Sequence, residues 1–149
     1  MHFAYEISQA ELAEWEKWYL PPPSVSKDND LILDVGARDG DTALFYLEHG
    51  YRRLRLIEPN LIYVDDLMAN VREMGAQFNA DIEVRFRPFK KEEDLLGVAF
   101  AKFDCEGCEA EAGLNTLTIP WAAELHEKNK PDEKGVYPYV AFTGYARGP

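Results

Sequence analysis

From Leu31 onward, short apolar runs alternate with segments of helical periodicity, and this alternation constrains the fold more than any other feature of the sequence. Residues 31–35 and 98–104 are nearly continuous apolar runs, which is typical of strands buried on both faces of a sheet. Residues 53–59 form a further predicted strand. In residues 82–87 apolar and charged side chains alternate, which favours an edge strand. Strands that alternate with helices predict a parallel sheet with right-handed crossovers.

Helices are predicted between these strands and before the first of them. Ser8 and Glu11 have the spacing of a capping box, at the start of a helix predicted over residues 8–19. The same periodicity predicts further helices over residues 41–49, 63–74, 91–96 and 108–117. Asp41 is expected to cap the first of these, and Gly75 is expected to end the second.

Two more strands are predicted, over residues 121–125 and 137–145, the last at an edge because it contains Pro138. The expected fold class is therefore α/β. It is a Rossmann-like three-layer sandwich with a short N-terminal helix and a mostly parallel sheet of order 3-2-1-4-5, to which the tail adds an edge strand. Such a sheet opens a ligand crevice at the carboxyl ends of its first and fourth strands.

The length of 149 residues suits one domain. Within it, residues 1–30 are the N-terminal helix and its connection, residues 31–127 the core, and residues 128–149 the C-terminal strand and tail.

Charge and composition exclude several classes of partner. The net charge of −11 repels phosphate backbones, so nucleic acid is disfavoured. No apolar run approaches the roughly 20 residues of a membrane helix, and the acidic N-terminus has no secretory signal pattern. Two cysteines, Cys105 and Cys108, are too few for a disulfide framework. These features predict a cytoplasmic protein.

The segment DVGARDGDT, residues 34–42, joins the first strand to the next helix and has the character of a ligand-binding loop. Gly36 permits a sharp turn and the close approach of a ligand, and Gly40 permits close packing at the helix start. Glu58 ends the next strand, where a carboxylate can accept hydrogen bonds from two ribose hydroxyls. The loop and Glu58 together predict a nucleoside site.

The charges of this loop choose between two nucleoside ligands. A dinucleotide rests its pyrophosphate on a helix N-terminus. Asp34, Asp39 and Asp41 would repel pyrophosphate but tolerate the sulfonium and ammonium groups of S-adenosylmethionine. The loop therefore favours S-adenosylmethionine over NAD as the cofactor.

Three stretches of the chain resemble the class I S-adenosylmethionine-dependent methyltransferases, and within them the FkbM-type family. They are residues 31–50 (LILDVGARDGDTALFYLEHG), 55–73 (RLIEPNLIYVDDLMANVRE) and 99–127 (AFAKFDCEGCEAEAGLNTLTIPWAAELHE). The third is similar to that family's K-x-D-x-E-G-x-E segment and the E-L-H that follows it. The positions here are Lys102, Asp104, Glu106, Gly107 and Glu109, then Glu124, Leu125 and His126.

The resemblance implies a methyltransferase whose donor site lies at the ends of the first, second and fourth strands. The residues assigned to this site are Asp34, Gly36, Ala37, Arg38, Gly40, Asp41, Thr42, Glu58, Pro59, Asn60 and Asp104. Family members are mostly thought of as O-methyltransferases, so the implied acceptor is a hydroxyl of a small molecule or sugar. This chain is short beside larger relatives, which have additional segments that recognise the acceptor. A second copy of the chain or a partner subunit is therefore an alternative way to complete the acceptor site.

Methyl transfer to a hydroxyl benefits from a base that removes its proton. Asp104, Glu106 and His126 are the candidate catalytic residues, and the resemblance places the first two opposite the methyl group. The carboxylates of Asp104, Glu106 and Glu109 alternatively hold a divalent cation, although no metal is the preferred expectation. The tail contains four aromatic residues, Tyr137, Tyr139, Phe142 and Tyr145. The sequence leaves three interpretations of them open: an acceptor pocket, a dimer contact and the core face of a strand.

Two other functions are weighed against the enzyme. One is a non-catalytic subunit or sensor that binds S-adenosylmethionine. The other is a redox protein or zinc site built on the C-x-x-C spacing of Cys105 and Cys108. Glu106 and Glu109 oppose a stabilised thiolate, so the cysteines are expected to be small residues at a strand end.

Overall fold

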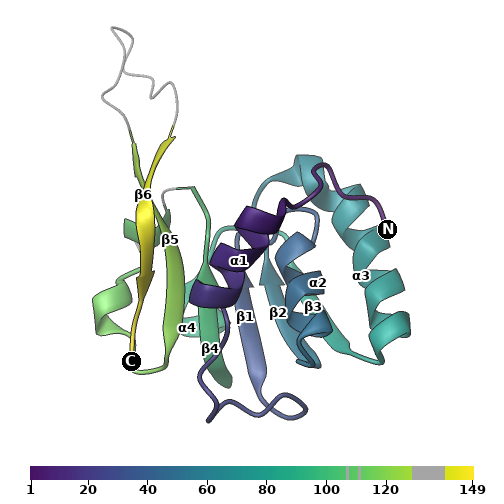
Figure 1. Cartoon of the computed structure of the whole chain (residues 1–149), viewed down its shortest axis with the longest axis horizontal. Helices are drawn as coiled ribbons and strands as arrows, with labels where there is room; N and C mark the ends of the chain where they lie inside the picture. Colours follow the sequence, from purple (N-terminus) through teal and green to yellow (C-terminus); the bar gives the residue numbers. More distant parts are fainter. Residues whose placement is uncertain (107, 111, 129–139) are drawn as a thin grey trace, which may run out of the picture.

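Six strands form one sheet in the order β3-β2-β1-β4-β5-β6 (Figure 1). The structure is a computed structural model, and it describes residues 1–106, 108–110, 112–128 and 140–149. The strands are β1 (Leu31–Val35), β2 (Arg53–Ile57), β3 (Asp81–Arg85), β4 (Val98–Phe103), β5 (Trp121–Lys128) and β6 (Val140–Arg147). The first five are parallel and β6 is antiparallel to β5. The predicted order is confirmed, and the tail supplies the extra edge strand.

Helices cover the two faces of the sheet unequally. The helices are α1 (Gln9–Trp18), α2 (Asp41–Glu48), α3 (Val64–Phe78) and α4 (Lys91–Asp94), and the 3-10 turns are η1 (Leu61–Tyr63), η2 (Cys108–Ala110) and η3 (Leu114–Thr116). One apolar cluster joins Trp15 of α1, Phe45 of α2 and Leu67 of α3 to the sheet. The other face is covered by the shorter α4, η2, η3 and their loops. No helix in the described ranges is both long and apolar enough to span a membrane.

The N-terminal helix begins where the capping box predicts. The hydroxyl of Ser8 accepts a hydrogen bond from the backbone N–H of Glu11 at 3.1 Å. At the other end, Tyr19 is the C-cap and is completely buried, and the hydroxyl of Tyr46 donates to its carbonyl oxygen at 3.0 Å. Figure 1 shows α1 lying across the sheet over its central strands, which brings its side chains close to the strand ends.

Three sequence predictions about the helices are wrong. Gly75 lies inside α3, which continues to Phe78 and ends at Asn79, a residue that tolerates its left-handed φ of +49°. The N-cap of α2 is Gly40, at φ +95°, and Asp41 is the first helical residue. The predicted helix over residues 108–117 is replaced by η2 and η3, because Gly113 turns the chain with φ +64° between them.

Candidate functional site

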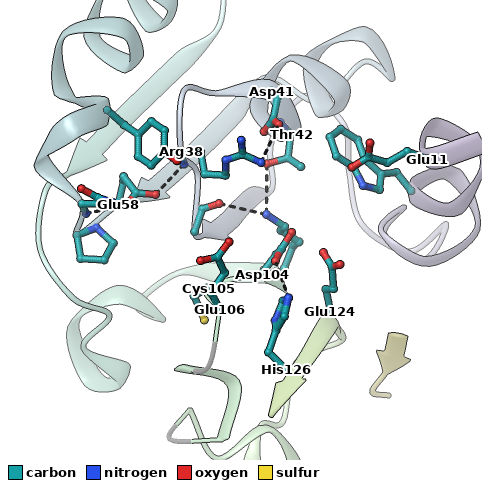
Figure 2. Close-up of a pocket in the computed structure, with 16 residues that line it drawn as sticks. Glu11, Arg38, Asp41, Thr42, Glu58, Asp104, Cys105, Glu106, Glu124 and His126 are labelled. Carbon is teal, nitrogen blue, oxygen red and sulfur yellow. Dashed lines mark hydrogen bonds and ion pairs between the residues drawn. The ribbon is translucent and has the colours of Figure 1, made fainter. Parts of the chain in front are cut away.

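A cavity of about 300 Å³ opens at the carboxyl ends of the central strands (Figure 2), as the strand order predicts. We call it the strand-end pocket. Its walls come from the loops after β1 and β2, the ends of β4 and β5, and the side of α1. The lining residues are Glu11, Trp15, Gly36, Arg38, Asp41, Thr42, Glu58, Pro59, Asn60, Tyr63, Lys102, Asp104, Cys105, Glu106, Glu124 and His126.

The loop after β1 is fixed by contacts that only glycine permits. Gly36 has φ +87°, and a Cβ at this position would stand 1.8 Å from the carbonyl oxygen of Asp104. The N–H of Asp104 in turn donates to the carbonyl of Val35 at 2.9 Å. The glycine loop and the end of β4 are therefore packed directly against each other, with no room for a side chain between them.

Glu58 is held at the edge of the strand-end pocket by two backbone amides. Its Oε2 accepts from the N–H of Arg38 at 2.8 Å, and its Oε1 accepts from the N–H of Asn60 at 2.7 Å. Burial raises the pKa of this carboxyl, and the two amide hydrogen bonds oppose that rise. Each carboxylate oxygen has a second lone pair, so the fixed side chain can still accept hydrogen bonds from two hydroxyls of a ligand.

A buried ion pair lies beneath the glycine loop. The Nζ of Lys102 lies 2.8 Å from Oδ1 of Asp34, and both side chains are at most 1% exposed. The hydroxyl of Thr42 donates to the other oxygen of Asp34. Burial alone would lower the pKa of Lys102, but the neighbouring acids, Asp34 foremost, raise it, so the lysine keeps its positive charge. The charge of Asp34 is thus neutralised inside the protein.

The loop acids were predicted to face the ligand together, and two of them do not. Of the three acids expected to face the ligand, only Asp41 lines the cavity, where burial raises its pKa to about 6. Asp39 is 2% exposed and accepts a hydrogen bond from the N–H of Ala4 at 2.8 Å. The N-terminal segment therefore covers Asp39, and Asp34 is paired with Lys102. Negative charge in the pocket comes mainly from acids of other elements.

Carboxylates gather where β4 and β5 end. Asp104 and Glu124 both lie near the phenol of Tyr19, whose hydroxyl is 3.3 Å from Oε2 of Glu124 and 3.5 Å from Oδ2 of Asp104. Burial and the adjacent Asp104 raise the pKa of Glu124 to about 8. Burial also raises the pKa of the Tyr19 phenol. Glu124 and Tyr19 therefore share a polar cluster in which the protonated form of each side chain is favoured.

His126 stands between two carboxylates on β5. Its Nδ1 lies 2.8 Å from Oε1 of Glu109, and its Nε2 lies 4.0 Å from Oδ1 of Asp104. Asp104, Glu109 and His126 each offer one ligand atom within 4.8 Å of the others, so these three residues can hold a metal ion. The cation site considered from the sequence consisted of Asp104, Glu106 and Glu109. In the structure the side chain of Glu106 is exposed, and His126 takes its place in the cluster.

The turn after β4 contains a disulfide between Cys105 and Cys108. The two cysteines follow the end of a strand, as expected, but the sequence did not predict their bond, which forms because Glu106 takes φ +51° and turns the chain back on itself. With this bond present, the two cysteines no longer support the predicted cytoplasmic location. Gly107, the glycine of the family motif, lies outside the described residues.

The predicted site residues divide into two groups. Those that line the pocket are Gly36, Arg38, Asp41, Thr42, Glu58, Pro59, Asn60, Asp104, Glu106 and His126. Asp34, Ala37 and Gly40 are buried behind this lining. Lining residues absent from the sequence-based assignment are Glu11, Trp15, Tyr63, Lys102, Cys105 and Glu124. Lys102 and Glu124 had a signal, since both stand in the matched third stretch, whereas nothing in the sequence of α1 indicated that it crosses the strand ends.

The tail aromatics that the structure describes pack beside the site. The ring of Phe142 lies 6.3 Å from that of His126 and 5.3 Å from that of Tyr145. Tyr145 stacks on Trp18 of α1 with 5.8 Å between the ring centroids. Tyr137 and Tyr139 lie outside the described residues. The two described aromatics thus connect β6 to both α1 and His126.

Comparison with solved structures finds methyltransferases. The C-terminal domain of precorrin-6Y C5,15-methyltransferase from Rhodobacter capsulatus is similar with a TM-score of 0.58 and 11% identity, over 98% of this chain and 89% of that one. Geranyl diphosphate methyltransferase, solved with S-adenosylmethionine, is similar with a TM-score of 0.57 and 14% identity, over 80% of this chain and 50% of that one. An O-methyltransferase from Bacillus cereus, solved with S-adenosylhomocysteine, is similar with a TM-score of 0.51 and 14% identity, over 81% of this chain and 58% of that one.

These likenesses show the fold, which is that of the class I S-adenosylmethionine-dependent methyltransferases. The chain spans about half the length of the second and third of these proteins. No family model and no curated protein matches the sequence. The assignment to the FkbM-type family therefore stays a prediction.

Proposed function

We propose that this protein binds S-adenosylmethionine in the strand-end pocket and transfers its methyl group to a hydroxyl of a small molecule or sugar. The observation that carries the proposal is Glu58, fixed by the amides of Arg38 and Asn60 at the edge of a pocket that Gly36 leaves open. Two similarly folded methyltransferases were solved with this cofactor or its product, which supports the same ligand here.

The pocket has matching groups for each part of the cofactor. Glu58 would hold the ribose through its remaining lone pairs. Asp41 and Asp104 would attract the cationic ammonium and sulfonium groups. Pro59, Asn60 and Tyr63 continue the lining beside Glu58 and would contact the adenine ring of the cofactor. The fit is one of charge and shape, and it does not depend on Asp34.

The cofactor, when bound, supplies a methyl group whose bond to sulfur breaks as its bond to the acceptor oxygen forms. The protein's part is to orient the acceptor and to take up its proton. Asp104 and His126 line the pocket at the ends of β4 and β5 and offer atoms for both tasks. Glu106 lines the rim of the same region.

The test is transfer of label from methyl-labelled S-adenosylmethionine to a panel of sugars and phenols by the purified chain. Label should appear in at least one acceptor, and Asp104→Asn should abolish transfer. Glu92→Gln, on the exposed surface of α4, is the matched control and should leave transfer unchanged. Binding without transfer across the panel would instead favour a non-catalytic subunit or sensor. Full activity of Asp104→Asn would show that the role given to Asp104 is wrong.

A further inference from the structure

Glu109 is a buried acid beside His126 that does not line the strand-end pocket. Its side chain is 2% exposed, and its Oε1 lies 2.8 Å from Nδ1 of His126. The same oxygen accepts the backbone N–H of Cys105 at 3.2 Å. Burying a carboxylate costs free energy unless hydrogen bonds compensate, so these contacts hold the side chain in a defined place. Glu109 is thus anchored to the turn after β4 and directed at His126.

The contact with Glu109 decides which nitrogen of His126 carries the proton in the neutral ring. Oε1 of Glu109 already accepts from the backbone N–H of Cys105, and a carboxylate oxygen that accepts in this way has no hydrogen to donate to the histidine. Nδ1 of His126 must therefore be the donor, and Nε2 is left with a free lone pair. This is the arrangement by which a carboxylate orients a histidine base in hydrolytic triads.

Nε2 faces the reaction side of the pocket. Figure 2 shows the imidazole of His126 directed toward the carboxylate of Asp104. The distance from Nε2 to Oδ1 of Asp104 is 4.0 Å, too long for a hydrogen bond. Nε2 therefore points into the pocket without being consumed by a direct contact with Asp104.

We infer that Glu109 is a positioning residue, which holds His126 with its proton on Nδ1 so that Nε2 receives the proton of the acceptor. This inference rests on the proposed methyl transfer and names the atom that acts as its base. As the new carbon–oxygen bond forms, the acceptor's O–H bond breaks and its proton passes to Nε2. The resulting imidazolium lies between the carboxylates of Glu109 and Asp104, which stabilise its charge until the proton leaves to water.

The groups around His126 come from three strands and a 3-10 turn. Glu109 of η2, Asp104 at the end of β4 and Glu124 on β5 itself are the titratable neighbours. From β6 the nearest ring is that of Phe142, which carries no charge. The surroundings of the imidazole are therefore acidic on the side of β4 and η2 and apolar on the side of β6.

The tautomer of His126 is measurable without any reaction. The chain contains three histidines, so a long-range ¹H–¹⁵N spectrum of labelled protein at about pH 8.5 shows three imidazole patterns. The pattern that disappears in His126→Gln belongs to His126, and His2→Gln and His49→Gln assign the other two. The expected pattern has a proton on Nδ1 and none on Nε2. A proton on Nε2 in the unmodified protein would overturn the inference.

Kinetics then separate positioning from folding. In Glu109→Gln the affinity for S-adenosylmethionine should stay within about twofold, while kcat falls about 10- to 100-fold. Glu109→Asp keeps a carboxylate and should recover part of that loss. Glu92→Gln is the matched surface control and should behave as the unmodified protein. A kcat in Glu109→Gln equal to that of the unmodified protein would overturn the role of Glu109.

The two proposals fail in different ways. If the unmodified protein transfers no methyl group, the proposed function fails, while the spectrum still decides the tautomer. If transfer occurs and His126 carries its proton on Nε2, the proposed function stands and the role of Glu109 falls.

Discussion

Gly36 and the carbonyl oxygen of Asp104 are in such close contact that a Cβ on the glycine would stand 1.8 Å from that oxygen. Gly36 belongs to the loop after β1 and Asp104 follows the end of β4, so the two residues are 68 positions apart in the sequence. One loop provides the proposed cofactor cradle and the other provides the acids of the reaction end. Their contact therefore fixes the geometry of both halves of the strand-end pocket.

Replacing Gly36 by alanine tests this contact. Gly36→Ala combines an unfavourable φ of +87° with a clash against backbone, so we expect it to lower the free energy of unfolding by about 3 kcal/mol or more. The matched control is Gly97→Ala, where φ is +74° but no atom lies within 4 Å of the added Cβ. That variant should lose only about 1 kcal/mol in urea denaturation. Equal losses in the two variants would contradict the packing argument.

The buried pair of Lys102 and Asp34 should behave as one unit. Lys102→Met leaves a carboxylate without its counter-ion, and we expect a loss of about 3–5 kcal/mol in the free energy of unfolding. Adding Asp34→Asn removes that buried charge and retains an oxygen that can accept from Thr42. The double variant should therefore be more stable than Lys102→Met alone. Additive losses in a double-mutant cycle would show that the two side chains are not coupled.

Glu124 should make the protein less stable as the pH rises. Burial and Asp104 raise its folded-state pKa to about 8, so between its ordinary value and that pH the folded state holds a proton that the unfolded state has released. The free energy of unfolding therefore falls with rising pH, by less than about 1.4 kcal/mol per pH unit because the carboxyl is partly exposed. Glu124→Gln should flatten this slope in urea titrations. A slope identical to that of the unmodified protein would contradict the assignment to Glu124.

The disulfide between Cys105 and Cys108 should be detectable in the purified protein. Iodoacetamide under denaturing conditions should add nothing before reduction and two groups after it, as mass spectrometry would show. Because the closed loop is short, Cys105→Ser with Cys108→Ser should lower the free energy of unfolding by about 2 kcal/mol at most. Two adducts without reduction would contradict the bond. Methyl transfer by the double variant would also exclude a redox function for the pair.

The sequence predicted what depends on local pattern. The parallel order of the first five strands followed from apolar runs and one alternating strand, and the crevice followed from that order. Ser8 and Glu11 likewise identified the start of α1 through a purely local hydrogen bond. Features of this kind are encoded within a few residues of each other.

What the sequence did not predict depends on contacts between distant residues. Asp34 was expected to face a ligand, but Lys102, far along the chain, neutralises it. Asp39 was expected to do the same, but the N-terminal segment covers it through Ala4. The helix predicted near Cys108 gave way to 3-10 turns, since apolar periodicity does not report a turn at Gly113.

Calorimetric titration with S-adenosylmethionine, with NAD as the comparison ligand, tests the central claim most directly. The strand-end pocket should bind S-adenosylmethionine with a Kd of about micromolar order and should not bind NAD. Glu58→Ala should weaken binding by about 1–3 kcal/mol through unpaired ribose hydroxyls, while Glu48→Ala on the exposed side of α2 should not. A folded sample that gives no heat with millimolar S-adenosylmethionine, or that binds it equally well after Glu58→Ala, would contradict the account.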